Sequence, residues 1–275
     1  MTIAAVWRHG DRLFAVADTR IVRSPGNVLT EHGPKLLPIG ISCKKPGPSG
    51  FFDREAYRTN IGFAYAGGTL PALSTHALAN ALLQKLVAAD GAPPPDLAQV
   101  ATAIRELAWY YMREVGELSG AAALFSTILF GFCAATGRFR AFELKPDVSS
   151  GSLKINIHEH DVGSDEALVV IGSRPDLLRE RVAKMRIEAH PAIHDDLPRR
   201  ALRNLIAEDA DPTIGGSVQY GWATIVGFEP IASGEPIIPA LPSGRNITSS
   251  VLGFDIMTFP PVGNYHFSMA GRVVV

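Results

Sequence analysis

The 275-residue chain has little of several features that mark special classes of protein. It holds only two cysteines, Cys43 and Cys133, which are too few for a framework of disulfide bonds. Its 26 basic and 27 acidic residues leave a formal net charge of -1, and no run of lysine or arginine is longer than a pair. Nucleic-acid binding needs a clustered basic excess, so the sequence predicts neither a nucleic-acid partner nor a polybasic membrane contact.

Long hydrophobic runs are also missing from the chain. A membrane-spanning helix needs roughly 18 or more consecutive apolar residues, and no such stretch is present. The first residues also lack the basic and apolar regions of a signal peptide, so we expect a cytoplasmic protein that does not bind membranes. Charged residues are 19% of the chain and apolar residues 47%. This composition predicts a large core, apolar surfaces between subunits, or both.

The predicted elements follow the order strands, two helices, strands, two helices. Strands are predicted at 3–7, 13–17, 35–41, 61–66, 124–133, 138–144, 153–158, 167–171 and 217–227. Helices are predicted at 69–89, 97–115, 174–186 and 197–208. Segments 22–34 and 44–60 are rich in turn residues and are predicted to be irregular. This order favours two sheets packed face to face between pairs of helices.

The first predicted helix has an apolar pattern. Leucines and alanines recur at three- and four-residue spacing from Leu70 through Leu73, Leu78 and Leu82 to Leu86. This spacing predicts that they form the side of the helix that faces the core.

Thr2 draws attention because it follows the initiator methionine, and a small residue at this position permits removal of Met1. An N-terminal threonine combines a nucleophilic hydroxyl with a base, its own α-amine. Threonine at position 2 is common, so its surroundings decide its interpretation. Here Thr2 begins an apolar strand, Asp18 ends the partner strand, and Lys35 begins the next strand.

This arrangement resembles the proteasome β-subunit family of N-terminal nucleophile hydrolases. Asp18 lies 16 residues after Thr2, as in that family, and Lys35 lies 17 residues after Asp18, one residue later than the family's spacing. The family also has an Ala-Gly pair before its first long helix, and Ala66-Gly67 stands at that place here.

The resemblance continues into the second half of the chain. Gly172-Ser173 looks like the family's Gly-Ser pair, and Asp211 looks like the aspartate of its Asp-x-x-Ser-Gly segment. Asp211 is favoured over Asp209 by spacing alone. Ile214 stands where the family has serine, although Thr213 and Ser217 are close in sequence.

The resemblance implies a role for each of these residues. The Thr2 hydroxyl attacks a carbonyl carbon while the Thr2 amine acts as the base. Lys35, buried and paired with Asp18, favours loss of the hydroxyl proton. The Gly67 N–H donates to the oxyanion, and Ser173 and Asp211 support the amine.

Residues next to such a site are expected to shape a substrate pocket. By resemblance these are Ile21, Tyr65 and Thr69, which suggests a preference for an apolar side chain.

No metal or other cofactor is predicted. His158 and His160 alternate on one face of a strand, and His190 and His194 lie four residues apart, but no third ligand is evident near either pair. The chain also lacks the glycine-rich loops that hold nucleotide phosphates.

We therefore predict an α+β protein with one domain over residues 1–275, a four-layer α-β-β-α sandwich with an extended C-terminal segment at 228–275. The resemblance implies a threonine-type endopeptidase made without a propeptide. It would hydrolyse peptides or unfolded proteins inside a homo-oligomer of rings or stacked rings, a design that allows an ATPase partner. Two alternatives stay open: a non-catalytic assembly subunit of the same fold, and an N-terminal nucleophile amidase acting on a small molecule.

Overall fold

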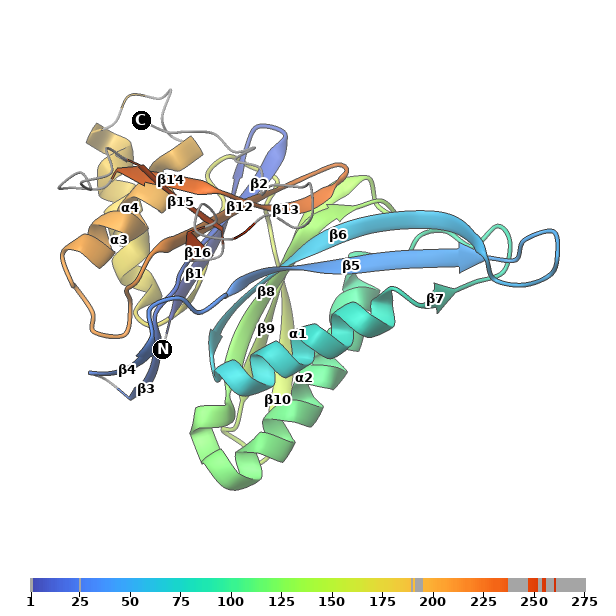
Figure 1. The fold of residues 1–275 in the computed structure, drawn as a ribbon, viewed down its shortest axis with the longest axis horizontal. Helices are drawn as coiled ribbons and strands as arrows, with labels where there is room; N and C mark the ends of the chain where they lie inside the picture. Colours follow the sequence, from blue (N-terminus) through green and yellow to red (C-terminus); the bar gives the residue numbers. More distant parts are fainter. Residues whose placement is uncertain are drawn as a thin grey trace.

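The computed structural model shows two β-sheets packed face to face between two pairs of helices (Figure 1). It describes residues 2–24, 26–188, 190, 195–236, 247–251, 254–255 and 260. The α+β class and the four-layer α-β-β-α sandwich predicted from the sequence are thereby confirmed.

The first sheet has five antiparallel strands in the order β11-β1-β2-β12-β13. The strands predicted at 3–7 and 13–17 pair as a hairpin within this sheet, with Gly10 at φ 57° in the turn. The single strand predicted at 217–227 is instead a hairpin, because the chain turns back after Thr224. The strands of this sheet are β1 (Ile3–His9), β2 (Arg12–Asp18), β11 (Leu168–Gly172), β12 (Val218–Thr224) and β13 (Gly227–Ile231).

The second sheet has six strands in the order β10-β9-β8-β6-β5-β7. The segment 44–60, predicted to be irregular, lies mostly in strands, because β5 and β6 extend well past the predicted ends and pair as a long hairpin. Its turn residues mark only the tip, 46–53. The strands are β5 (Leu36–Lys45), β6 (Arg54–Gly67), β7 (Leu86–Val87), β8 (Phe125–Cys133), β9 (Arg138–Asp147) and β10 (Lys154–His160).

The layer between the two sheets is lined largely by small side chains. Ala4, Ala15 and Ala17 of the first sheet and Ala64 and Ala66 of the second are all buried in one cluster. Small side chains let two sheets approach closely, since side-chain volume sets the thickness of such a layer. This close approach brings β2 and the start of β5 together at one end of the sandwich.

Helices cover the two outer faces. One apolar cluster joins the first two helices to the six-stranded sheet, and another joins the last two to the five-stranded sheet. All four predicted helices are present, and a short 3-10 helix follows the second. The helices are α1 (Thr69–Leu83), α2 (Leu97–Ser119), η1 (Gly120–Ala123), α3 (Pro175–Glu188) and α4 (Leu197–Ala207).

Helix α1 differs from its prediction in length and in orientation. It ends at Leu83 and not at residue 89, and the chain then adds the short strand β7 to the sheet. It buries mostly small residues, including Ala72, Thr75 and Ala79, whereas Leu70 and Leu82 are exposed. Apolar residues occupy both sides of this helix, so their spacing fits either orientation, and close packing selects the side with small residues.

The segment 22–34 was also predicted to be irregular, and the structure corrects this. Strands β3 (Ile21–Ser24) and β4 (Asn27–Thr30) form a two-stranded hairpin directly after β2. Gly26, at φ 79°, lies in its turn. The turn residues of the segment therefore mark one tight turn rather than a long loop.

The C-terminal segment predicted at 228–275, including its proline-rich stretch 229–245, lies largely outside the described residues. The described parts add three short strands that form a sheet in the order β14-β15-β16. These are β14 (Ser233–Pro236), β15 (Ile247–Val251) and β16 (Phe254–Asp255).

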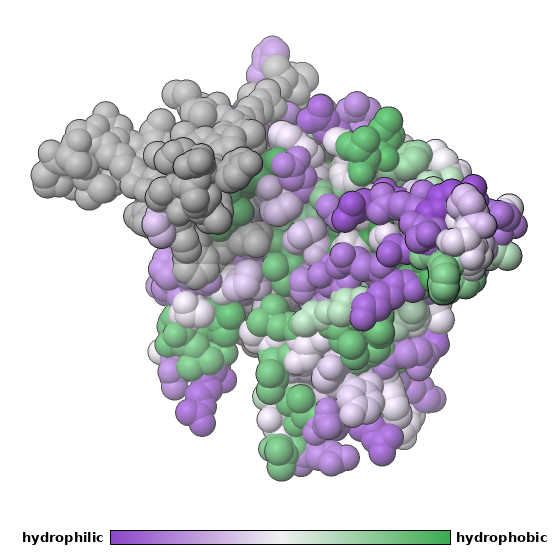
Figure 2. All heavy atoms as spheres, turned by 45° about the vertical axis from the view of Figure 1, so that its right-hand side comes forward, coloured by the Kyte–Doolittle hydropathy of each residue, from purple (hydrophilic) through white to green (hydrophobic). Residues whose placement is uncertain are grey.

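The surface mixes polar and apolar residues. Figure 2 shows one face on which hydrophilic side chains are interrupted by separate hydrophobic patches. Large apolar side chains with high exposure include Leu70 on α1, Leu118 on α2 and Phe51 at the tip of the β5–β6 hairpin. None of the helices in the described part of the chain is long and apolar enough to cross a membrane.

Asp196 directly precedes α4 and pairs with two arginines of its first turn. Its carboxylate accepts hydrogen bonds from Arg199, at 2.6 and 3.0 Å, and from Arg200, at 2.9 Å. Burial alone would raise the pKa of Asp196, but the two guanidinium groups bring it below its ordinary value. The ionised carboxylate is therefore the form that stabilises the fold.

We expect Asp196→Asn to lower the free energy of unfolding at pH 7 by about 1–3 kcal/mol, because it removes the carboxylate that pairs with the buried Arg199 and the half-buried Arg200. A depressed pKa gives stability that is present above about pH 3.9 and is lost as the pH falls through the folded-state pKa. Urea unfolding at several pH values measures this. The difference in free energy of unfolding between the natural protein and the variant should become smaller below about pH 4. A difference that does not change with pH would contradict the stabilising role of the ionised Asp196 carboxylate.

Candidate active site

Asp18, the last residue of β2, has no exposed surface and accepts four hydrogen bonds. Its Oδ1 accepts from the Lys35 Nζ at 2.9 Å and from the Ile3 N–H at 3.0 Å. Its Oδ2 accepts from the Gly215 and Arg20 N–H groups, each at 3.2 Å. A buried carboxylate is tolerated when its lone pairs are filled in this way. Asp18 thus joins the residue after Thr2 to Lys35.

Lys35 directly precedes β5 and is 1% exposed. Besides its ion pair with Asp18, its ammonium donates to the Arg20 carbonyl. The Lys35 carbonyl accepts from the Tyr65 N–H of β6 at 3.1 Å. The ion pair therefore connects the six-stranded sheet to the five-stranded sheet across the layer between them.

The surroundings of the ion pair favour uncharged forms of both groups. Burial lowers the pKa of Lys35, and the charge of Asp18 limits the drop. Burial also raises the pKa of Asp18, against the opposing effect of Lys35 and of the backbone N–H groups. Four groups donate hydrogen bonds to the Asp18 carboxylate, and they favour its ionised form. The lowered pKa of Lys35 means that its ammonium group gives up a proton more readily than a lysine on the surface does.

Thr2 lies beside this pair and is almost completely buried. The Thr2 carbonyl accepts from the Ser173 N–H at 2.8 Å, and the following N–H, of Ile3, donates to Asp18. The close approach depends on Gly172, which has φ 109° and whose hypothetical Cβ would lie 1.8 Å from the Thr2 carbonyl oxygen. Only glycine fits there. Thr2 is therefore held from both sides, by β2 and by the end of β11.

Asp211 and Thr213 extend the cluster beyond Ser173. Asp211 Oδ1 accepts from the Thr213 N–H at 2.8 Å and from its hydroxyl at 2.5 Å, and the Thr213 and Ser173 hydroxyl oxygens lie 3.4 Å apart. Asp209 is largely exposed, and the Ser217 N–H bonds to a different hydroxyl. Thr213, the residue before Ile214, thus places a hydroxyl between Ser173 and Asp211.

Gly67 ends β6 two residues beyond Tyr65, at the end of the sheet where Lys35 enters. Its φ is 115°, and a Cβ there would lie 2.5 Å from the Leu124 carbonyl oxygen. The position therefore requires glycine for two reasons, backbone conformation and lack of space.

The three residues predicted to line a substrate pocket differ in exposure. Ile21 and Thr69 are partly exposed, and Ile21 packs against Gly33. Tyr65 is fully buried, and its hydroxyl donates to the Pro34 carbonyl at 3.1 Å. Burial raises the pKa of Tyr65 well above its ordinary value, so it stays protonated.

Gln219 of β12 also belongs to this cluster, and sequence analysis did not single it out. Its Oε1 accepts from the N–H groups of Lys35 and Leu36, at 2.9 and 3.0 Å. Its Nε2 donates to the carbonyls of Gly33, at 2.6 Å, and Asp18, at 3.4 Å. Gln219 thus fixes the backbone that carries Lys35. The only signal for it was one amide side chain in a mostly apolar strand.

In the part of the chain that the structure describes, no three His, Cys, Asp or Glu side chains are grouped so that they could hold a metal ion. His158 and His160 lie with ring centroids 4.5 Å apart, and His160 bonds to Glu143 at 2.9 Å. His194 lies outside the described residues.

Four layers in the order α-β-β-α, with Thr2 at the start of a central strand of one sheet, define the N-terminal nucleophile hydrolase fold of the proteasome type. The fold predicted by resemblance is confirmed by solved structures. The chain is similar to Anbu from Pseudomonas aeruginosa, solved as a helical assembly, with a TM-score of 0.55, 16% identity, and coverage of 83% of this chain and 85% of that one. It is also similar to Anbu, described as an ancestral beta-subunit, from Yersinia bercovieri, with a TM-score of 0.54, 14% identity, and coverage of 81% and 82%.

A third similar structure is Anbu from Hyphomicrobium sp. strain MC1, with a TM-score of 0.52, 16% identity, and coverage of 81% of this chain and 82% of that one. No protein-family model and no curated protein matches the chain. At these identities the likeness establishes the fold, and the chemistry has to be argued from the site itself.

Proposed function

We propose that this protein is a threonine-type N-terminal nucleophile peptidase. The observation that carries the proposal is the buried ion pair of Lys35 and Asp18, which is bonded to the backbone directly after Thr2. A buried ion pair often contributes nothing to stability relative to apolar residues of the same size. Its presence at the one threonine that can become N-terminal is explained by catalysis.

The proposed reaction begins when removal of Met1, which lies outside the described residues, frees the Thr2 α-amine. The Thr2 Oγ1 attacks the carbonyl carbon of the substrate and forms a C–O bond, and its proton passes to the α-amine. The Lys35 ammonium stabilises the developing alkoxide, and the Gly67 N–H stabilises the oxyanion. The C–N bond then breaks, the departing amine takes the proton, and water hydrolyses the resulting ester.

Ser173, Thr213 and Asp211 are assigned to the Thr2 amine in this proposal. The chain of hydroxyl and carboxylate groups that they form ends at a negative charge. It can orient the amine lone pair toward the Thr2 hydroxyl and stabilise the amine after it has taken a proton.

Specificity is assigned to Ile21 and Thr69, which are partly exposed next to the site. Tyr65 is fully buried and is hydrogen-bonded to Thr69. An apolar wall favours substrates with an apolar side chain before the cleaved bond.

We further propose that the protein works as a self-compartmentalised homo-oligomer of rings or stacked rings. Leu70 and Leu82 of α1 are exposed, and contacts between subunits would bury them. The solved helical assembly of a protein with the same fold supports assembly into an oligomer.

The proposal is tested by intact mass, N-terminal sequencing and labelling with a peptide epoxyketone, which forms its adduct only with a free α-amine and hydroxyl on one residue. We expect loss of Met1 and a single label on Thr2. Retention of Met1 without labelling would favour a non-catalytic assembly subunit. Labelling without cleavage of any peptide, but with cleavage of small amides, would favour an amidase.

A further inference from the structure

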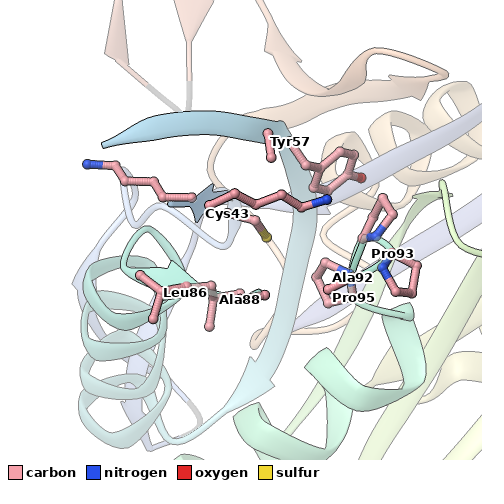
Figure 3. A pocket seen from close by; sticks show the side chains of 12 residues that line it. Cys43, Tyr57, Leu86, Ala88, Ala92, Pro93 and Pro95 are labelled. Carbon is pink, nitrogen blue, oxygen red and sulfur yellow. The ribbon is translucent and has the colours of Figure 1, made fainter. Parts of the chain in front are cut away.

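A cavity lies far from the candidate active site, at the opposite end of β5. It has a volume of about 230 Å³ and lies between the distal part of the β5–β6 hairpin, β7 and the loop before α2. Strand β5 spans ten residues, which places the cavity about 30 Å from Lys35. In Figure 3, the Cys43 thiol points into the space between Leu86 and Ala88 on one side and Ala92 and Pro95 on the other.

The walls of the cavity are apolar and held in place. Most of the lining residues are aliphatic, aromatic or proline, and three consecutive prolines, 93–95, form one side. Proline fixes its backbone φ, so this wall loses little entropy when a ligand binds. Two contacts hold the segment before α2 against the β5–β6 hairpin. They are the ion pair of Arg54 with Asp90 and the hydrogen bond from the Ala88 N–H to the Lys44 carbonyl, at 3.0 Å. The cavity is therefore preformed.

Two lysines, Lys44 and Lys45, line the same cavity, and no carboxylate of the described residues lies within ion-pair distance of either. The nearby acids already have partners. Asp90 pairs with Arg54, and Glu55 lies 3.7 Å from the Arg58 guanidinium. Successive residues of a strand point to opposite faces, so Lys45 lies on the cavity face with Cys43 and Lys44 on the other face. Lys45 therefore gives the edge of the cavity a positive charge without an internal partner.

We propose that this cavity is a binding site for a small carboxylic acid that carries an apolar group, with the apolar group in the cavity and the carboxylate at Lys45, which shares the face of β5 with Cys43. Apolar walls with a few convergent charged groups are the usual form of a small-molecule site. Since water occupies about 30 Å³ per molecule, a cavity of about 230 Å³ has room for roughly eight non-hydrogen atoms, which is enough for the carbon atoms of a benzyl group. Phenylacetate is the corresponding probe.

The experiment compares phenylacetate with phenylacetamide, which has the same shape without the charge. Binding is measured by protection of Cys43 from iodoacetamide, followed by mass spectrometry, and by saturation-transfer NMR. Burial raises the pKa of the Cys43 thiol, so its alkylation is slow enough to follow. We expect about millimolar affinity for phenylacetate, from the size of the ligand, and at least fivefold weaker binding of the amide.

Variants identify the site. Lys45→Met should reduce phenylacetate affinity to that of the amide, and Ala92→Trp should fill the cavity and abolish binding of both. Lys85→Met is the matched control, because Lys85 is exposed and does not line the cavity, and it should bind as the natural protein does. Circular dichroism confirms that each variant is folded.

Equal binding of acid and amide, or an unchanged affinity in the Lys45→Met variant, would overturn the proposal. So would the absence of Cys43 protection at 20-fold the expected millimolar concentration. The result is independent of peptidase activity, since Thr2→Ala should bind phenylacetate unchanged.

Discussion

Replacing Lys35 with methionine is expected to abolish peptide hydrolysis and to lower the free energy of unfolding by about 3–5 kcal/mol. Methionine keeps most of the buried volume but removes the ammonium that pairs with Asp18. The carboxylate is then left with backbone donors alone, in a site with no exposure. Urea unfolding gives the loss of stability, and cleavage of a fluorogenic peptide gives the loss of activity.

A second variant separates the two effects of Lys35. Lys35→Met combined with Asp18→Asn should recover about 2 kcal/mol, because no charge is then left unpaired in the interior. It should recover no hydrolysis. If the double variant regained activity together with stability, Lys35 would be a structural residue only, and its proposed effect on the Thr2 hydroxyl would be wrong.

Thr2→Ala is expected to lower kcat/KM by about 10³-fold or more while the protein stays folded. The change removes the hydroxyl and one methyl group, and the Thr2 backbone contact with Ser173 is kept. Thr2→Ser retains the nucleophile and should keep measurable activity, which distinguishes loss of chemistry from loss of packing. The two variants are compared on the same peptide substrate, after mass spectrometry has shown that both have lost Met1.

Thr2→Ala also serves as a control for a contaminating protease, which would copurify equally with all variants. If Thr2→Ala were as active as the natural protein, the measured activity would not depend on Thr2, and Thr2 would not be the nucleophile. Full activity of a preparation that retains Met1 would lead to the same conclusion.

The order of the elements could be predicted from the sequence because each central strand is a short apolar run bounded by turn residues. The pairing of Asp18 with Lys35 could be predicted as well, since a buried acid at a strand end needs a cation and the resemblance supplied one. Their roles in catalysis, like that of Thr2, remain predictions. The contacts of Thr213 could not be predicted. The sequence showed only that a hydroxyl residue precedes Ile214, which stands where the similar family has serine.

Other features could not be predicted for physical reasons. Helix α1 is apolar on two sides, and only packing against the sheet decides which side is buried. The length of the β5–β6 hairpin was missed because its distal part is polar and half solvated, so it lacks the apolar run typical of a buried strand. Gln219 bonds to backbone groups far away in sequence, and no local pattern encodes such contacts.

The ion pair of Lys35 with Asp18 spans two sheets, and this has a consequence for the biogenesis of the protein. Neither sheet alone carries the full set of groups that the proposed chemistry needs. A chain in which the two sheets have not yet packed together lacks this ion pair. For the proposed peptidase, competence for hydrolysis therefore arises only once both sheets have packed, and an incompletely folded chain is not expected to cleave its neighbours.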